Sequence, residues 1–178
     1  TYMFTHPGKK LNFMGNEFGQ LREWDEKREQ DWDLLSYPSH DSFAHYFRLL
    51  SSLYLSSPAL YEKEYDSRYF KWLKPYMGDG CVYAYERGSE GQKLVVLVNV
   101  SKKDYRELKV EYDGGGILRE ILNSDENEFG GSGVVNPLPV AVKEDSATGR
   151  SVFTVALAPY GSCVLEVVTN PAVSGSHK

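Results

Sequence analysis

Acids and two tryptophans crowd a short polar stretch near the start of the sequence. Trp24 and Trp32 lie in it among charged neighbours, namely Arg22, Glu23, Asp25, Glu26, Lys27, Arg28 and Glu29. An indole face packs well on the C–H face of a sugar ring, while carboxylates such as Glu23 and Asp25 accept bonds from its hydroxyls. The tryptophans can instead anchor this loop against a helix or a β-domain, and for Trp32 we favour that second interpretation.

Another acid, Glu17, follows a short apolar run. Residues 9–14 are typical of a strand, and they lead directly into Gly15-Asn16-Glu17-Phe18-Gly19-Gln20. A glycine-flanked acid at the end of a strand can hold the surrounding loops or approach a substrate hydroxyl. It can equally be a carboxylate that braces its own loop, and the sequence favours neither role.

Metal binding and nucleophilic catalysis are poorly supported. The acids of residues 23–29 alternate with basic residues, contain no histidine and lack calcium-loop spacing, which is typical of a solvated loop. No serine or cysteine is placed with a base and an orienting acid, so we expect no catalytic residue, metal or cofactor. We expect His40-Asp41 to cap a helix, and Cys81 and Cys163 to be buried thiols in strands.

Composition narrows the classes of partner. The 178 residues contain 20 basic and 25 acidic side chains, a net charge of −5, without the basic cluster that nucleic-acid binding requires. No apolar run is long enough to cross a membrane, and the first residues do not resemble a secretion signal. We therefore expect a soluble, cytoplasmic protein that binds neither nucleic acid nor membrane.

The elements that must position these residues change along the chain. Apolar residues recur at helical spacing over residues 42–56, with Ser39 or Asp41 available as N-cap and Pro58 beyond the end. Alternating strand patterns follow, separated by turns rich in Gly, Asp and Ser; they cover residues 69–73, 81–87, 93–100, 105–112, 117–122, 151–156 and 162–168. This spacing predicts a mainly β protein with an antiparallel β-sandwich.

The opening strand poses a problem of organisation, because a lone parallel strand needs neighbours that this sequence does not supply. We expect those neighbours upstream, as the earlier units of a (β/α)8 barrel would be. The expected divisions are residues 1–60 as the barrel's last strand, loop and helix, residues 61–170 as the sandwich, and residues 171–178 as a tail. Residues 11–14 should pack on the sandwich, pair with another copy, or be poorly ordered.

The segment from Gly8 to Gln20, followed by Arg22-Glu23-Trp24 and Asp31-Trp32-Asp33-Leu34-Leu35, resembles bacterial 1,4-α-glucan branching enzymes of the α-amylase superfamily. The similarity continues through Pro58-Ala59-Leu60, Leu122-Asn123-Ser124-Asp125 and Leu157-Ala158-Pro159-Tyr160. Leu21 departs from the pattern, since many members carry a tryptophan there. The resemblance implies the last barrel strand and loop followed by the carboxyl-terminal β-domain.

The resemblance also implies a function for a longer parent protein. Branching enzymes cut an α-1,4 glucan and rejoin it through an α-1,6 bond by a retaining route, with an Asp nucleophile and a Glu acid/base. Those acids would lie upstream of Thr1, so this chain alone should be inactive. The implied partners are the upstream barrel and an α-glucan such as glycogen or amylose, with Glu17, Glu23, Trp24, Asp25 and Trp32 as candidate substrate-binding residues.

Two other functions stay open at this stage. A stand-alone α-glucan-binding module would use exposed aromatics without chemistry, although the unpaired front segment disfavours it. Another hydrolase of the α-amylase superfamily would share the same barrel-then-sandwich plan. Gly19-Gln20 with Arg22-Glu23-Trp24 favours a branching enzyme over such a hydrolase.

Overall fold

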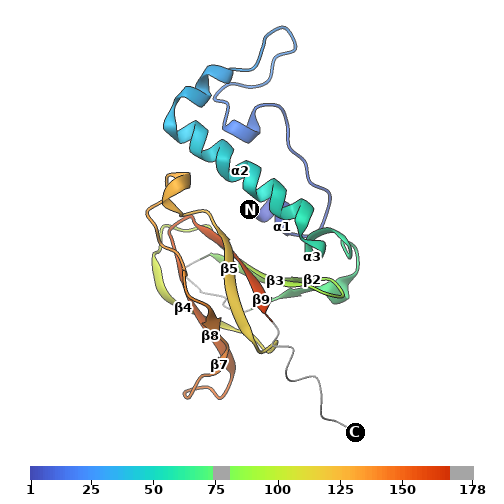
Figure 1. The fold of residues 1–178 in the computed structure, drawn as a ribbon, viewed down its shortest axis with the longest axis vertical. Helices are drawn as coiled ribbons and strands as arrows, with labels where there is room; N and C mark the ends of the chain where they lie inside the picture. Colours follow the sequence, from blue (N-terminus) through green and yellow to red (C-terminus); the bar gives the residue numbers. More distant parts are fainter. Residues whose placement is uncertain (74–80, 169–178) are drawn as a thin grey trace.

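The computed structural model describes residues 1–73 and 81–168, and it arranges them as a layer of helices on two stacked sheets (Figure 1). The larger sheet has the strand order β1 (Phe70–Trp72), β2 (Val82–Gly88), β3 (Lys93–Asn99), β9 (Ser162–Val168), β5 (Ile117–Asn123) and β6 (Val140–Ala141). The smaller sheet has the order β4 (Tyr105–Glu111), β8 (Ser151–Leu157) and β7 (Lys143–Glu144). Every described pairing is antiparallel, which confirms the predicted mainly β fold.

The two sheets enclose one core between them. Ala84, Leu97 and Cys163 are register neighbours on β2, β3 and β9, and all three are buried in this core. The smaller sheet supplies Phe153 of β8 and Val110 of β4 from the other side. Successive strand residues point to opposite faces, so the residues between these core positions face the other way.

The opposite face of the larger sheet carries the helices. These are α1 (Tyr2–Thr5), α2 (Pro38–Ser56) and α3 (Pro58–Tyr61), with the short 3-10 helices η1 (Asn16–Phe18), η2 (Trp32–Ser36), η3 (Ser67–Tyr69) and η4 (Asn127–Phe129). A second core lies between the layers, where Tyr85 and Val96 of the sheet pack with Tyr46, Leu50 and Leu60 of the helices. The front of the chain therefore shares a core with the sandwich.

Most predicted strands lie within a residue or two of the observed ones. The alternation missed only the two-residue strands β6 and β7 among the described residues. The hairpin predicted at 88–91 is confirmed, since Ser89 N donates to Gln92 O at 2.8 Å between β2 and β3. The turn predicted at 78–80 and the tail at 171–178 lie outside the described residues.

Cys81 corrects one prediction. Cys163 is buried as expected, and burial raises the pKa of its thiol. Cys81, however, is exposed, because it precedes the first residue of β2 and so lies outside the alternating part of that strand. The prediction of a buried thiol was therefore wrong for Cys81.

The run at residues 9–14 also differs from its prediction, because no strand forms there. Leu11, Phe13 and Met14 are exposed instead of paired. A strand requires a neighbour whose N–H and C=O groups complete the ladder, and the described residues place none beside this run. The local pattern was apolar enough for a strand, but the pattern cannot supply a partner.

The predicted helix is confirmed, but its start is wrong by four residues. Helix α2 begins at Pro38, with Tyr37 as N-cap and no side-chain capping bond. Proline is well suited to the first helical position because its missing N–H has no partner there in any case. His40 and Asp41 therefore lie inside the first turn, and neither caps the helix.

Among the described residues, no helix has both the length and the apolar character needed to cross a membrane.

Candidate functional site

The candidate site begins at the tight turn that carries Glu17. Gly15 and Gly19 flank η1 with φ values of 89° and 68°, a left-handed conformation that glycine adopts without strain. The Glu17 carboxylate accepts bonds from Gly15 N at 3.1 Å and from Asn12 Nδ2 at 3.0 Å. Glu17 thus braces its own loop, while its side chain stays partly exposed.

A polar cross-link closes the base of the loop formed by residues 21–31, here called the acidic loop. Arg22 Nε donates to both carboxylate oxygens of Asp31, at 2.8 and 3.0 Å, and Arg22 Nη2 donates to Glu29 O. Asp31 N donates in turn to Gln20 Oε1 at 3.0 Å. These bonds join the two ends of the loop, which extends beyond the start of α2 on the side away from the strands (Figure 1).

The two tryptophans lie on different supports. Trp24 packs edge-on against Phe13 at 5.7 Å between ring centroids, and it remains 42% exposed. Trp32 packs against the buried Phe18 at 4.9 Å, and it is 46% exposed. Trp32 therefore packs against the turn at Glu17, whereas Trp24 rests on a ring that is itself half exposed.

The five candidate residues are spread over the turn at Glu17, the acidic loop and the start of η2. Glu23 is exposed, and Asp25 accepts a bond from Lys27 N at 2.9 Å within its own turn. No aromatic contact joins the two indoles in the described part of the chain. What the acidic loop offers is an exposed surface with indole faces and carboxylates, which suits binding to an extended polar ligand.

The helical layer fixes the turn at Glu17. His40 Nδ1 on α2 lies 2.9 Å from Phe18 O, the residue next to Glu17. Sequence reasoning assigned His40 to a helix cap, so this contact was missed. The contact joins residues 22 positions apart, and no local pattern in the sequence indicated it.

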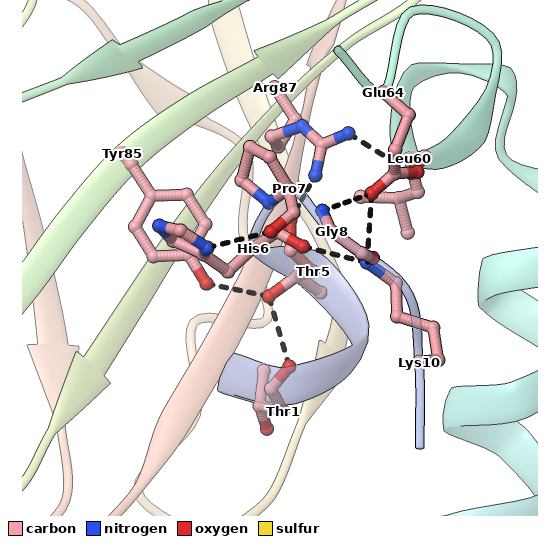
Figure 2. Close-up of polar contacts among 10 residues, drawn as sticks. All are labelled: Thr1, Thr5, His6, Pro7, Gly8, Lys10, Leu60, Glu64, Tyr85 and Arg87. Atoms are coloured by element: carbon pink, nitrogen blue, oxygen red, sulfur yellow. Dashed lines mark hydrogen bonds and ion pairs between the residues drawn. The ribbon is translucent and has the colours of Figure 1, made fainter.

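A buried polar network holds residues 1–14, here called the front segment, on the larger sheet (Figure 2). Arg87 on β2 is buried, and its guanidinium donates to Thr5 O at 2.6 Å and to Leu60 O at 3.0 Å. Tyr85 Oη lies 2.6 Å from Thr5 Oγ1. Burial lowers the pKa of Arg87 and raises that of Tyr85, as expected for groups held away from water.

The second half of this network joins Lys10 to Glu64. Lys10 Nζ donates to the backbone oxygens of His6 and Gly8 and to the Glu64 carboxylate at 3.2 Å, and Gly8 N donates to the same carboxylate oxygen. Burial lowers the pKa of Lys10, while the hydrogen bond that it donates to Glu64 opposes that shift. The network thereby fastens residues 5–10 to the end of α3 and to the loop that follows it.

Sequence reasoning missed this network, although one signal for it was available. Arg87 has the same strand parity as Tyr85, opposite to that of Val82 and Ala84, so alternation placed Arg87 on a buried face. In the residues that the structure describes, no group of three or more His, Cys, Asp or Glu side chains could hold a metal ion.

Comparison with known proteins gives one matching family and several similar relatives. Residues 72–168 match the family described as "Alpha amylase, C-terminal all-beta domain". The chain is 42% identical over 137 residues to the 1,4-alpha-glucan branching enzyme GlgB of Oceanobacillus iheyensis, covering 76% of this chain and 22% of that protein. It is 37% identical over 168 residues to the enzyme of the same name from Shewanella frigidimarina, covering 93% of this chain and 23% of that protein.

Solved structures share the fold. A debranching enzyme from Nostoc punctiforme aligns over 92% of this chain and 29% of its own length, with a TM-score of 0.60 and 15% identity. AmyP in complex with maltotriose aligns over 94% of this chain and 33% of its own length, with a TM-score of 0.62 and 14% identity. This chain spans about a quarter of the length of the curated relatives it matches.

Proposed function

Because this chain belongs to the family of alpha-amylase C-terminal all-beta domains, we propose that it is the carboxyl-terminal part of a 1,4-alpha-glucan branching enzyme. The match to the Shewanella frigidimarina enzyme carries the proposal, because it covers 93% of the chain. A match of that extent includes the helical layer and the acidic loop as well as the sandwich. The activity proposed for the whole protein is retaining transfer of an α-1,4 glucan segment to an α-1,6 position.

The front segment gives this part a structural role in the whole enzyme. Leu11, Phe13 and Met14 form an exposed apolar run beside the turn at Glu17. Contiguous exposed apolar surface of this kind marks an interaction site. We place the upstream barrel against this run, so that residues 9–14 become its last strand and the boundary near residue 60 separates barrel from sandwich.

The acidic loop gives this part a role with substrate. We assign substrate contact to Glu17, Glu23, Trp24, Asp25 and Trp32, which all lie on or beside the cross-linked loop. Trp24 is the strongest of these, since its exposed ring packs on Phe13, which is itself half exposed. The catalytic acids would come from the upstream barrel, and this chain's residues would bind and orient the glucan.

A test of the proposal combines two separately purified pieces. The chain would be assayed on amylose with iodine staining, alone and mixed with an upstream barrel expressed separately. We expect no branching from either piece alone and branching from the mixture. Activity from the chain alone would contradict the placing of the catalytic acids in the upstream barrel. If the two pieces form a complex but the mixture is inactive, the assignment to a branching enzyme is wrong.

The acidic loop can be tested in the same mixture. Replacing Trp24 by alanine removes an exposed ring, and we expect it to lower the branching rate about fivefold through the loss of about 1 kcal/mol of stacking. Leu138→Ala is the matched control, because Leu138 is also an exposed apolar residue but lies near β6. An unchanged rate in the Trp24 variant would remove Trp24 from the substrate contacts.

A second candidate function is a stand-alone α-glucan-binding module, which the exposed indoles of the acidic loop favour. Retention of the chain on amylopectin, combined with failure to restore branching to any upstream barrel, would support it. The cytoplasmic location expected from the sequence also stays a prediction, and fractionation of the producing cells would check it.

A further inference from the structure

A groove of about 790 Å³ lies beside the buried network, at the end of α2 and the loop after α3. Three tyrosines line it, Tyr54, Tyr61 and Tyr65, together with Lys9 of the front segment. We propose that this groove, here called the tyrosine groove, is a second α-glucan-binding site, separate from the acidic loop. This inference rests on the proposed function, because α-glucan is the ligand that the function supplies.

Parts of the three rings in the tyrosine groove are open to solvent, although Lys10 Nζ lies over the Tyr54 ring at 5.2 Å and Lys9 Nζ over the Tyr65 ring at 5.9 Å from the centroids. Tyr61 and Tyr65 are exposed, and Tyr54 meets Tyr61 at 6.1 Å between centroids with an interplanar angle of 65°. The two rings therefore pack edge-to-face on each other within the lining of the groove, and a sugar chain lying in it would contact both. A tyrosine ring contributes large apolar area and few rotatable bonds, which suits it to the C–H face of a sugar.

Polar groups around these rings are free to bind hydroxyls. In the described residues, neither the Glu62 carboxylate nor the hydroxyls of Tyr61 and Tyr65 have a hydrogen-bond partner. Ser67 adds another hydroxyl to the lining. Sugar recognition combines a flat apolar face with polar groups at its edge, and the tyrosine groove has both.

The charges of the lining favour a neutral ligand. Lys9 and Lys63 line the groove together with Glu62, Glu64 and Asp66. Partners outside the lining pair with three of them: Lys10 with Glu64, Arg68 with Asp66 and Glu90 with Lys63. The positive and negative charges therefore balance, and the groove has no excess of positive charge to attract an anion such as phosphate. A neutral polyhydroxyl chain is the ligand class that this balance fits.

The walls are held in place before any ligand arrives. Gly8 N donates to the Glu64 carboxylate at 2.5 Å, which fixes the front segment to the loop after α3 (Figure 2). Within that loop, Asp66 N donates to Lys63 O at 3.1 Å, and the Asp66 side chain accepts from Arg68 N at 3.1 Å. A preformed groove loses less conformational entropy on binding than a mobile one.

The tyrosine groove is far from the acidic loop. Tyr54 lies near the end of α2, whereas the acidic loop lies before its start, and the 19 residues of the helix span about 28 Å. One long α-glucan could therefore contact both places at once, with the tyrosine groove anchoring the polymer at a distance from the loop. Two linked contacts raise the apparent affinity for long chains more than for short ones.

Binding of maltoheptaose to the purified 178-residue chain tests this inference, with isothermal titration calorimetry as the readout. We expect the double variant Tyr61→Ala, Tyr65→Ala to weaken binding about tenfold, and Tyr65→Phe to retain binding within twofold because the ring remains. Tyr160→Asn is the control, since Tyr160 is 71% exposed, as Tyr65 is 76% exposed, but lies in the turn between β8 and β9. Asparagine tolerates the positive φ of 54° at that position.

Several results would overturn the inference. They are undiminished binding by the double variant when circular dichroism shows it folded, equal loss in Tyr160→Asn, or no binding of maltoheptaose by the unaltered chain. Loss of all binding in Trp24→Ala would likewise place the only site on the acidic loop. None of these results bears on the branching assay of the two mixed pieces, so failure of the groove and failure of the proposed function are separable.

Discussion

The sandwich and the segment of residues 9–37 differ in how the N–H and C=O groups of their backbones find hydrogen-bond partners. In the sandwich, β3 pairs along its length with β2 on one side and β9 on the other. Residues 9–37 contain only 3-10 turns and side-chain bridges such as Arg22 to Asp31. An alternating pattern therefore forms a strand only where the chain also supplies its neighbours.

The two regions also differ in how they use apolar residues. Phe153 is buried between the sheets, whereas Phe13 and Leu11 face outward. Burying apolar surface stabilises a fold by about 25 cal/mol per Å², so residues 9–14 contribute little to the stability of this chain. The following predictions test that contrast, beginning with the largest effect.

The sharpest test compares two phenylalanines. Phe153→Ala should lower the free energy of unfolding by about 3 to 5 kcal/mol, because it leaves a cavity between tightly packed sheets. Phe13→Ala should lower it by less than about 0.5 kcal/mol, because its ring is half exposed. Urea denaturation followed by circular dichroism measures both. Similar losses in the two variants would break the contrast.

The next test concerns the network that joins the regions. Arg87→Ala should cost about 2 to 4 kcal/mol, because it removes charged donors from two buried carbonyl oxygens, Thr5 O and Leu60 O. It should also speed proteolysis within residues 1–20, while the sandwich stays protected. Arg150→Ala is the matched control, since Arg150 makes an exposed ion pair with Glu111 and should cost less than about 1 kcal/mol. Equal losses of stability in the two variants would contradict a stabilising role for the network.

A third test targets the loop that joins β5 to β6. This loop contacts α2, because Phe129 packs on Tyr46 at 5.1 Å between ring centroids. A Cβ at Gly131 would lie 2.2 Å from backbone atoms of Asp125, so Gly131→Ala should cost about 1 to 3 kcal/mol. Gly91→Ala meets no atom within 4 Å and serves as the control, with an expected change below about 0.5 kcal/mol. Thermal unfolding of the two variants would show whether the loop tolerates a side chain.

The smallest expected effect is a pH dependence of folding stability that comes from Asp125 in the same loop. Burial opposes ionisation of Asp125, but bonds from Val134 N, Ser132 N and Ser132 Oγ outweigh it and lower its pKa. Stability from this carboxylate is therefore full above its unfolded pKa, about 3.9, and is lost as pH falls through the lower folded pKa. Asp125→Asn should be less stable than the unaltered chain at pH 6, with the difference shrinking toward pH 2. Urea midpoints at both pH values measure this, and a constant difference would contradict it.

Seven strands and one long helix were predictable because their patterns are local. The alternation at residues 93–100 and 162–168 anticipated β3 and β9, and Pro58 anticipated the end of α2. The start of α2 was missed because a proline at the first helical position competed with the more familiar caps Ser39 and Asp41. The short strands β6 and β7 contain too few residues to show alternation.

The candidate site was only partly predictable. The sequence identified Trp24 and Trp32 as unusual in a charged loop, and it left the role of Glu17 open between structure and binding. The structure placed Trp32 on Phe18 and made Glu17 a brace of its own turn. It also brought together Tyr54, Tyr61 and Tyr65 in a groove that no motif marked.

What the sequence determined by itself was the fold class, since a period of two residues or of 3.6 residues is written in neighbouring positions. What only the tertiary structure decided was which groups meet: the absence of a strand at residues 9–14, the exposure of Cys81 and the hydrogen-bond partners of Arg87. The physical reason is that hydrogen-bond partners and burial depend on segments distant in sequence. Arg87 meets Thr5 across 82 positions, a separation that no local pattern encodes.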